Sequence, residues 1–265
     1  LDPEPSASTS SATSANGSYL QSFSKRFIVT DLHFVNRFCL VTNLPPWARR
    51  EPVFGVPLPS QGLSHTESVT EQRTMTIIYD LNLLKHPLQN PVLTIGNFDG
   101  VHKGHLALFD KVKERAQEIG GQSVVMTFDP HPVKVMHPKS APPLITTTAQ
   151  KLELIQEAGM DIVFCIPFTK DFAAIPAEDF VRAILLKRMG IKELVVGYDY
   201  TFGQGRKGTI RLLTSLGRQY GFDVHVVDPV RINNILVSST SIRDLVQAGE
   251  LGRAKALLGR DYQIS

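Results

Sequence analysis

"GNFDGVHKGH", residues 96–105, places three glycines, two histidines and one aspartate directly after the apolar run "PVLTI". A short run of this kind is typical of a strand buried on both faces of a parallel sheet. Beyond the stretch, apolar residues recur at helical spacing as far as the glycines at 120–121,. The sequence therefore predicts a strand, a loop and a helix that starts near His105, with His102 and Gly104 gathered at its amino end.

The same alternation continues along the chain. Further apolar runs are "SVVMTF", "DIVFCI", "ELVVG" and "DVHVVD", and helical patterns lie between them, such as "TTTAQKLELIQEAG" with threonine caps and "PAEDFVRAILLKRMG" with Pro176 in its first turn,. Alternating strands and helices predict an α/β fold, a Rossmann-like open parallel sheet of about five strands with helices on both faces. The ligand site of such a sheet lies at the carboxyl ends of its strands.

The bulk composition is that of a globular protein with small partners. The chain has 265 residues, 42% of them hydrophobic, and a net charge of +3 from 28 Lys and Arg against 25 Asp and Glu, without a basic block,. Cys39 and Cys165 are far apart and lack metal-ligand spacing, so we expect buried thiols in a reducing compartment,. No run has the length of a membrane span or the pattern of a secretory signal. We expect a cytoplasmic protein with neither nucleic-acid nor membrane partners.

Residues 1–74 read differently from the remainder. A Ser/Thr/Ala/Pro-rich segment opens the chain, and prolines interrupt the residues that follow, although "RFIVTDLHFVNRFCLV" has the composition of one or two strands,. Three explanations compete, namely a transit peptide, a disordered arm, and translated sequence upstream of a start at Met75. Acidic Asp2 and Glu4 count against a transit peptide. We favour the third explanation, with the folded domain at 75–259.

Glycines and two imidazoles at the amino end of a helix suit phosphate binding. Backbone N–H groups and the helix dipole attract anions there, and glycine lets a phosphate approach the backbone closely. The imidazoles of His102 and His105 can donate hydrogen bonds to the same oxygens and stabilise charge on a transferring phosphoryl centre. The alternative is a pair of capping or surface histidines. The glycine spacing and the flanking strand and helix favour the phosphate interpretation.

Four stretches in order resemble one family. "GNFDGVHKGH" is similar to the signature of the nucleotidylyltransferase superfamily in the form found in prokaryotic FAD synthetases, the FMN adenylyltransferase module of the bifunctional riboflavin biosynthesis enzymes. "TFDPHP" at 127–132, "VVGYDYTFGQGRKG" at 195–208 and "VSSTSIR" at 237–243 resemble further motifs of that family. The similarity covers nearly all of 75–265. It implies transfer of AMP from ATP to FMN, giving FAD and pyrophosphate, with Mg²⁺ held mainly by the ATP phosphates.

The second and third stretches also have chemical interpretations of their own. The prolines of "TFDPHP" favour an extended, rigid path that leaves Phe128, Pro130 and Pro132 as an apolar wall, although the stretch alone is more typical of a strand-ending turn. The resemblance implies contact with the flavin ring. In the glycine-rich third stretch, Arg206 and Lys207 either neutralise phosphate or are simply solvated.

The fourth stretch reads as the start of a second helix. Ser239 or Thr240 is the predicted N-cap, and Arg243 projects from the first turn,. An arginine fork suits phosphate oxygens, whereas a structural arginine would more often pair with a carboxylate. The resemblance favours phosphate. The aspartate of "GNFDG", Asp99, helps to position either the loop or the metal, and the sequence does not decide between them.

Together, the residues and the resemblance predict three groups of site residues. The catalytic group is His102, His105 and Arg243. The ATP- or phosphate-binding group is Gly96, Asn97, Phe98, Asp99, Gly104, Arg206, Lys207, Ser239 and Thr240. The FMN-binding group is Phe128, Pro130, His131, Pro132 and Asp199, with Asp199 implied to lie near the adenosine and the flavin phosphate.

Two other functions stay open, and so does one domain boundary. A nucleotidylyltransferase that uses another phosphorylated acceptor is disfavoured by "TFDPHP" and "VSSTSIR". A non-catalytic nucleotide-binding regulator is disfavoured by the intact histidines and Arg243. In the family, a riboflavin kinase module follows a junction similar to "LLGRDYQIS" at 257–265. We expect Gly259 to end the last helix, and 260–265 to be the start of that module.

The irregular composition of residues 1–74 predicts that they are dispensable. A chain beginning at Met75 should fold and should form FAD from ATP and FMN at the rate of the full chain, because every predicted strand of the sheet lies beyond that point. Circular dichroism and chromatography of the flavin products measure both properties. Loss of solubility or of FAD formation in the shorter chain would contradict the prediction.

Overall fold

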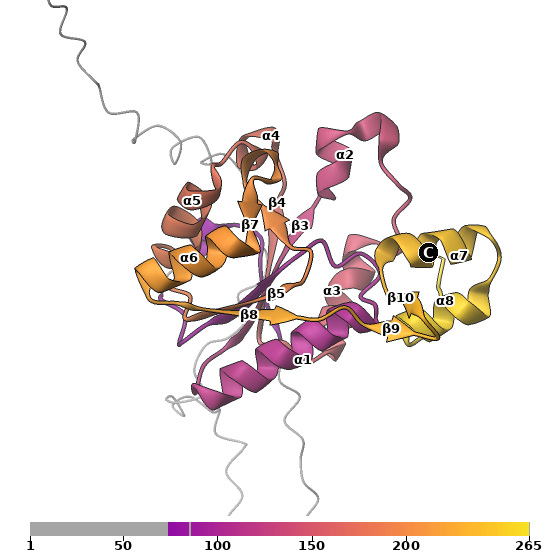
Figure 1. The fold of residues 1–265 in the computed structure, drawn as a ribbon, viewed down its shortest axis with the longest axis horizontal. Coiled ribbons are helices and arrows are strands. Elements are labelled where there is room, and N and C mark those ends of the chain that lie inside the picture. The colour runs from indigo at the N-terminus through magenta and orange to yellow at the C-terminus, as the bar shows by residue number, and fades with distance from the viewer. Residues whose placement is uncertain (1–73, 85, 265) are drawn as a thin grey trace, which may run out of the picture. The chain divides into compact units, whose positions relative to one another are not determined.

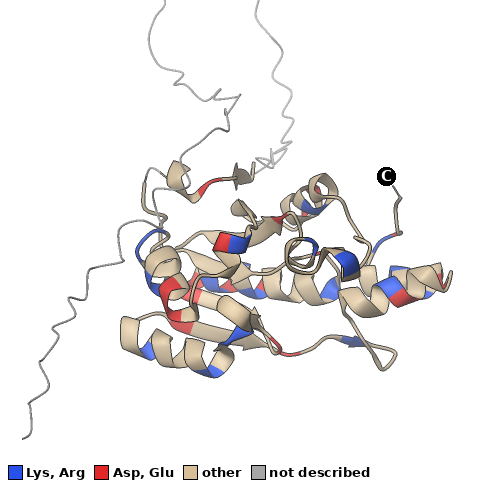
Figure 2. Ribbon diagram, turned by 90° about the horizontal axis from the view of Figure 1, so that it is seen from above, with Lys and Arg blue, Asp and Glu red and all other residues tan. Residues whose placement is uncertain are grey.

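The structure is a computed structural model that describes residues 74–84 and 86–264. The predictions for the extension before residue 74, including its strand-like run and Cys39, lie outside the described residues. Cys165 is described, and its thiol is free and buried within a strand, as expected. Charged residues of both signs are interspersed over the elements (Figure 2), so the electrostatics of any site depend on its local groups.

A six-stranded parallel sheet forms the centre of the fold (Figure 1). Its strands are β1 (Thr76–Ile78), β2 (Val92–Ile95), β3 (Ser123–Asp129), β4 (Ile162–Pro167), β5 (Glu193–Gly197) and β8 (Asp223–Val227). Their spatial order is β1-β4-β3-β2-β5-β8. The predicted α/β sheet is confirmed, and β1 adds an edge strand that the sequence patterns did not indicate. β1 was missed because it has only three residues, two of them exposed.

The order of the strands locates the ligand site. From β2 the chain moves outward through β3 and β4, and it then returns to the other side of β2 to form β5 and β8. The direction of winding therefore reverses between β2 and β5. In open α/β sheets, ligands bind outside the carboxyl ends of the strands at this switch point. The stretch at 96–105 follows β2 directly and so begins at the switch point.

Helices cover both faces of the sheet, as predicted. The longer ones are α1 (Lys103–Glu118), α3 (Thr148–Glu157), α6 (Ile210–Tyr220), α7 (Ser239–Gln247) and α8 (Leu251–Leu258). The shorter ones are α2 (Pro132–Met136), α4 (Lys170–Ala173) and α5 (Ala177–Asp179), which continues as the π-helical segment Phe180–Leu186. Two small hairpins pair β6 (Thr201–Phe202) with β7 (Gly208–Thr209), and β9 (Arg231–Ile232) with β10 (Ile235–Leu236).

Two cores form because successive side chains of a strand point to opposite faces. On one face, Leu93 and Ile95 of β2 pack with the π-helical segment and α6. On the other face, Val92 packs with Phe109 of α1 and Ile155 of α3. A third cluster joins α7 and α8 to the segment that precedes α3 (Figure 1). The third cluster brings α7 beside the loop that follows β2.

Several predicted boundaries hold and others move. Thr147 caps α3 through a capping box with Gln150, and Gly259, with a φ of 83°, ends α8 as predicted. The first helix begins at Lys103 rather than near His105 because the side chain of His102 is its N-cap. Pro176 is itself the N-cap of α5 and lies just before the first turn.

Two further local predictions are wrong. The N-cap of α7 is Ser238, whose hydroxyl accepts the N–H of Ser241, so Ser239 and Thr240 already lie inside the helix and Arg243 falls in its second turn. The path through "TFDPHP" is not extended throughout. Pro132 starts α2, because proline suits a first helical position and the side chain of His131 caps the helix,.

Thr94 on β2 provides a test of the α1-side core. Its side chain is fully buried, and its hydroxyl has no hydrogen-bond partner among the described residues. Thr94→Val keeps the shape and removes the unpaired polar group, so it should raise the free energy of unfolding by about 1 kcal/mol. Thr127→Val is the matched control, because the buried hydroxyl of Thr127 donates to the Asn97 carbonyl at 3.1 Å, and this variant should lose stability. Denaturant titrations measure both, and a less stable Thr94→Val would contradict the prediction.

Candidate nucleotide site

A pair of histidines caps the amino end of α1. His102 Nδ1 accepts the backbone N–H of His105, and His105 Nδ1 accepts the backbone N–H of His102, both at 3.3 Å. The two rings are stacked with their centroids 3.5 Å apart. A neutral imidazole whose Nδ1 accepts a hydrogen bond carries its proton on Nε2. Both histidines therefore keep an Nε2–H that is not used by the cap and can be donated to a ligand.

Burial keeps this pair uncharged. Desolvation lowers the pKa of His102 to about 4, with Arg260 and Arg243 acting in the same direction and Asp99 opposing them. Desolvation, followed by the charges of His102 and Arg260, lowers the pKa of His105 well below its usual value. At neutral pH the pair consists of hydrogen-bond donors and not of cations. The two interpretations of the histidines are therefore compatible. Each ring caps the helix through Nδ1 and presents Nε2–H on its other side.

The glycines of the loop allow close packing around these rings. A Cβ at Gly104 would lie 3.2 Å from the His102 ring, and a Cβ at Gly96 would lie 2.9 Å from the ring of Phe98. Phe98 is buried, has a positive φ of 49°, and contacts His105 edge-on with the ring centroids 5.1 Å apart. Of the predicted phosphate-binding residues, Gly96, Phe98 and Gly104 therefore shape and support the histidine pair.

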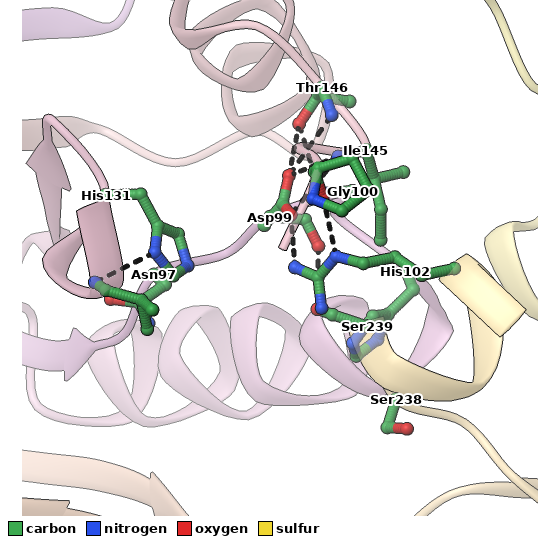
Figure 3. A network of polar contacts seen from close by, with 12 residues as sticks. Asn97, Asp99, Gly100, His102, His131, Ile145, Thr146, Ser238 and Ser239 are labelled. Atoms are coloured by element: carbon green, nitrogen blue, oxygen red, sulfur yellow. Dashed lines mark hydrogen bonds and ion pairs between the residues drawn. The ribbon is translucent and has the colours of Figure 1, made fainter. Parts of the chain in front are cut away.

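Asp99 holds three segments together. Its buried carboxylate accepts the backbone N–H groups of Ile145 and Thr146 at 3.0 and 3.1 Å, and it pairs with Arg243 Nη2 at 2.5 Å. Its backbone carbonyl accepts the hydroxyl of Ser239 at 2.9 Å. Figure 3 shows Ile145 and Thr146 beside the Asp99 carboxylate. Of the two roles left open for Asp99, these contacts fit the positioning of the loop.

Arg243 is partly engaged by the protein itself. Besides its pair with Asp99, its Nε donates to the carbonyl of Pro143 at 2.8 Å. Within the described part of the chain, Nη1 has no hydrogen-bond partner. Arg243 thus has the carboxylate partner that is expected of a structural arginine. This partner, Asp99, holds the guanidinium near the histidines. Thr240, one residue after Ser239, is exposed in the first turn of α7.

A small pocket opens where β2 and β3 end. Its lining residues are Asn97, Asp99, Phe128, Asp129, His131, Leu144, Thr146, Thr148 and Lys151. His131 Nδ1 accepts the N–H of Val133 at 3.2 Å, which again leaves Nε2 free of the cap, and burial lowers the pKa of this histidine. The ring of Phe128 is largely buried against Phe168. Pro130 and Pro132 continue the chain from this pocket into α2 and do not line it.

The remaining predicted residues lie on the loops after β5. Asp199 is exposed just beyond the carboxyl end of β5. Arg206 and Lys207 are exposed between β6 and β7, and Arg206 Nε donates to the Thr201 hydroxyl at 2.8 Å. In the described residues, none of these three shares a hydrogen bond or an ion pair with the loop at 96–105. Their predicted roles stay predictions.

Two cations at the site were missed by the sequence analysis. Lys151 is buried, and its Nζ donates to the carbonyls of Phe128 at 3.0 Å and Asn97 at 3.4 Å, while burial lowers its pKa. A lysine in line with the buried Leu152 and Ile155 on one helix face is the signal that could have revealed it,. Arg260 donates to the carbonyls of Gly100 and Val101, and no helical or strand pattern marks it.

A parallel sheet with a glycine- and histidine-rich loop at its switch point is the architecture of open α/β proteins that bind nucleotides. Residues 84–241 match the family model described as FAD synthetase. The chain belongs to the FAD synthetase family.

Curated relatives agree with this assignment. The chain is 38% identical over 184 residues to a bifunctional riboflavin kinase/FMN adenylyltransferase of Escherichia coli (strain K12), which covers 69% of this chain and 59% of the relative. It is 36% identical over 191 residues to the protein of the same name from Pseudomonas fluorescens, covering 72% and 61%. The chain therefore spans about three fifths of the length of these relatives.

A solved structure shares the fold. It is described as a macrolide-efflux protein from Streptococcus pneumoniae, and it matches with a TM-score of 0.61 and 29% identity over 71% of this chain and 62% of that chain. Efflux is part of the name of that protein alone. In the described residues of the present chain, no helix combines the length and the apolar character needed to cross a membrane.

The neutral state of His102 predicts acid-sensitive stability. Its pKa of about 4 in the folded chain lies below its ordinary value of 6.5, so between these values the unfolded chain binds the proton more readily,. The contribution of neutral His102 is complete above about pH 6.5 and is lost as the pH falls to about 4. Asparagine also caps helices but does not titrate. The free energy of unfolding of His102→Asn, from denaturant titrations, should therefore fall less steeply from pH 7 to pH 4, and equal slopes would contradict the prediction.

Proposed function

We propose that this chain transfers AMP from ATP to FMN, giving FAD and pyrophosphate. The observation that carries the proposal is the pair of uncharged, stacked histidines at the amino end of α1, whose cap uses Nδ1 and not the Nε2–H groups. Membership of the FAD synthetase family and the names of the curated relatives support FMN as the acceptor. The proposal covers the FMN adenylyltransferase activity in those names and does not extend to the riboflavin kinase activity.

The proposed reaction is an in-line displacement. A terminal phosphate oxygen of FMN attacks the α-phosphorus of ATP, the bond from that phosphorus to the bridging oxygen of the β-phosphate breaks, and pyrophosphate leaves with the electron pair. A phosphate monoester has a second pKa of about 6, so the attacking oxygen is already anionic near neutral pH and needs no general base. The protein aligns the two substrates and stabilises the charge that develops.

Each group at the carboxyl edge has a role in this proposal. His102 and His105 donate Nε2–H to phosphate oxygens next to the helix N-terminus, and Arg243, held by Asp99, adds its free Nη1 to the same anion,. The flavin would lie at the mouth of the small pocket that Phe128 and His131 line, beside the segment in which Pro130 and Pro132 lead into α2. From the loops after β5, Arg206 and Lys207 would approach ATP, and Asp199 would lie near the adenosine and the flavin phosphate. Asn97, Ser239 and Thr240 complete the phosphate-binding edge.

The metal is expected to arrive with the nucleotide. The described residues contain no group of three or more His, Cys, Asp or Glu side chains suited to hold an ion, and the Asp99 carboxylate is already engaged by Arg243 and two backbone N–H groups. Mg²⁺ commonly keeps several waters and binds substrate phosphates rather than an all-protein cage. We therefore assign Mg²⁺ to the ATP phosphates. The proposed reaction belongs in the cytoplasm, the location expected from the cysteine usage.

Incubation of the purified chain with Mg²⁺, ATP and FMN tests the proposal. FAD and pyrophosphate should appear in equal amounts, measured by chromatography and a coupled pyrophosphate assay. Pyrophosphate release with another phosphorylated acceptor, such as phosphopantetheine, but not with FMN would show that the acceptor is wrong. Binding of ATP without release of pyrophosphate from any acceptor would favour the regulator.

His105→Ala should lower kcat by roughly 10² or more, because it removes a fixed donor to charge that develops mainly in the transition state. The affinity for FMN should change far less. His86→Ala is the matched control, because His86 is exposed and precedes β2 at the opposite edge of the sheet. Steady-state kinetics with varied FMN separate kcat from KM. A variant that binds FMN poorly yet turns over normally at saturation would reverse the assignment.

A further inference from the structure

Arg260 binds the backbone of the loop immediately before the histidine pair. Its Nη2 donates to the Gly100 carbonyl at 2.6 Å, and its Nη1 donates to the Val101 carbonyl at 2.9 Å. Both of these loop residues have a positive φ, 86° for Gly100 and 35° for Val101. A β-branched residue such as Val101 adopts this conformation only when its surroundings enforce it. The guanidinium fork fixes the two carbonyls and therefore supports the strained turn that ends at His102.

The fork is carried on a rigid support. Arg260 follows Gly259 at the end of α8, a helix that buries Leu257 and Leu258 in the cluster shared with α7. A Cβ at Gly259 would lie 3.3 Å from the Cε of Lys103, so the end of α8 abuts the first residue of α1. The position of Arg260 relative to the histidine pair is thus set by packed helices and not by a free chain end.

The charge of Arg260 also acts on the pair. Burial lowers the pKa of Arg260, and Glu157 opposes this. In turn Arg260 lowers the pKa of His102 and of His105. The other charged groups that act on His102 are Asp99, which raises its pKa, and Arg243, which lowers it. A fixed cation therefore helps to keep both imidazoles in the form that donates from Nε2.

We propose that Arg260 is a positioning residue of the nucleotide site, which fixes the turn at Gly100 and Val101 and so aims the Nε2–H groups of His102 and His105. Arg260 lies beyond residue 241, where the family match ends, and within residues 260–265, which are predicted to begin a following module. Its hydrogen bonds tie it to the loop that begins the site. The kinetic consequence rests on the proposed adenylyl transfer, whereas the positioning itself does not.

Three variants of the full chain test this assignment. Arg260→Met removes both the fork and the charge, and Arg260→Lys keeps the charge but cannot bind two carbonyls as a planar fork. Arg253→Met is the matched control, because Arg253 is an exposed arginine of α8, the helix that precedes Arg260, and pairs there with Glu250. Two measurements are made on each, namely ¹⁵N NMR titration of the imidazoles without substrates and steady-state kinetics over pH with ATP and FMN.

In Arg260→Met, we expect His102 to titrate at higher pH than in the parent chain, and the acidic limb of the kcat profile to move to higher pH with it. At the optimum, kcat should fall about tenfold or more with little change in KM for FMN, because small misplacement of an aligned group is costly. Arg260→Lys should restore the titration and recover only part of kcat. Arg253→Met should behave as the parent chain.

Unchanged imidazole spectra and titrations in both Arg260 variants would overturn the proposal, and so would a kcat in Arg260→Met within twofold of that in Arg253→Met. If the parent chain forms no FAD, the proposed function fails, and the NMR titrations without substrates still decide whether Arg260 positions the pair. If Arg260→Met does not fold, Arg260→Lys is compared with Arg253→Met instead: it keeps the charge and loses the planar fork, so positioning by the fork predicts altered imidazole spectra and a lower kcat with an unchanged titration, and unaltered spectra and kcat would overturn the proposal.

Discussion

The ion pair between Asp99 and Arg243 is the contact on which the geometry of the site depends. Asp99 lies in the loop after β2, Arg243 lies on α7, and the backbone N–H groups of Ile145 and Thr146 complete the shell of the carboxylate. A buried carboxylate without such partners would be costly, because desolvation disfavours its charge. The loop after β2, the segment before α3 and α7 must therefore meet at Asp99 if its charge is to be compensated.

The site combines positive potential with uncharged donors. Helix N-termini and two arginines supply the potential, whereas burial keeps His102 and His105 neutral,. A charged imidazole pair with rings 3.5 Å apart would repel itself, and would also have lost the Nδ1 acceptors that cap α1. A neutral imidazole can accept the backbone N–H at Nδ1 and donate to a ligand from Nε2 at the same time,. It also frees the site from dependence on a proton near neutral pH.

The sequence predicts the sheet well and the site less completely. Buried strands such as Val92–Ile95 are readable because their apolar runs are local, and glycine at 259 marks a helix end for the same reason. The edge strand β1 was missed because three residues carry no period. The predicted N-cap of α7 was one or two residues too late in the chain, because all four residues of "SSTS" at 238–241 have hydroxyls that can cap a helix. Lys151 and Arg260 were missed because carbonyls 23 to 160 positions away in the chain give them their partners.

Helix α1 is fixed at both ends, and this explains how its amino end stays at the switch point. At its last turn, Arg115 pairs through Nε and Nη2 with the buried Glu193 of β5, both at 2.7 Å, and His225 of β8 contacts the same carboxylate at 2.8 Å. Hydrogen bonding by Arg115 lowers the pKa of Glu193, so the carboxylate remains charged in its buried position. The far end of α1 is thereby tied to β5, while its near end is tied to the loop after β2. Since the switch point lies between these two strands, any sliding of α1 along the sheet would break one end or the other.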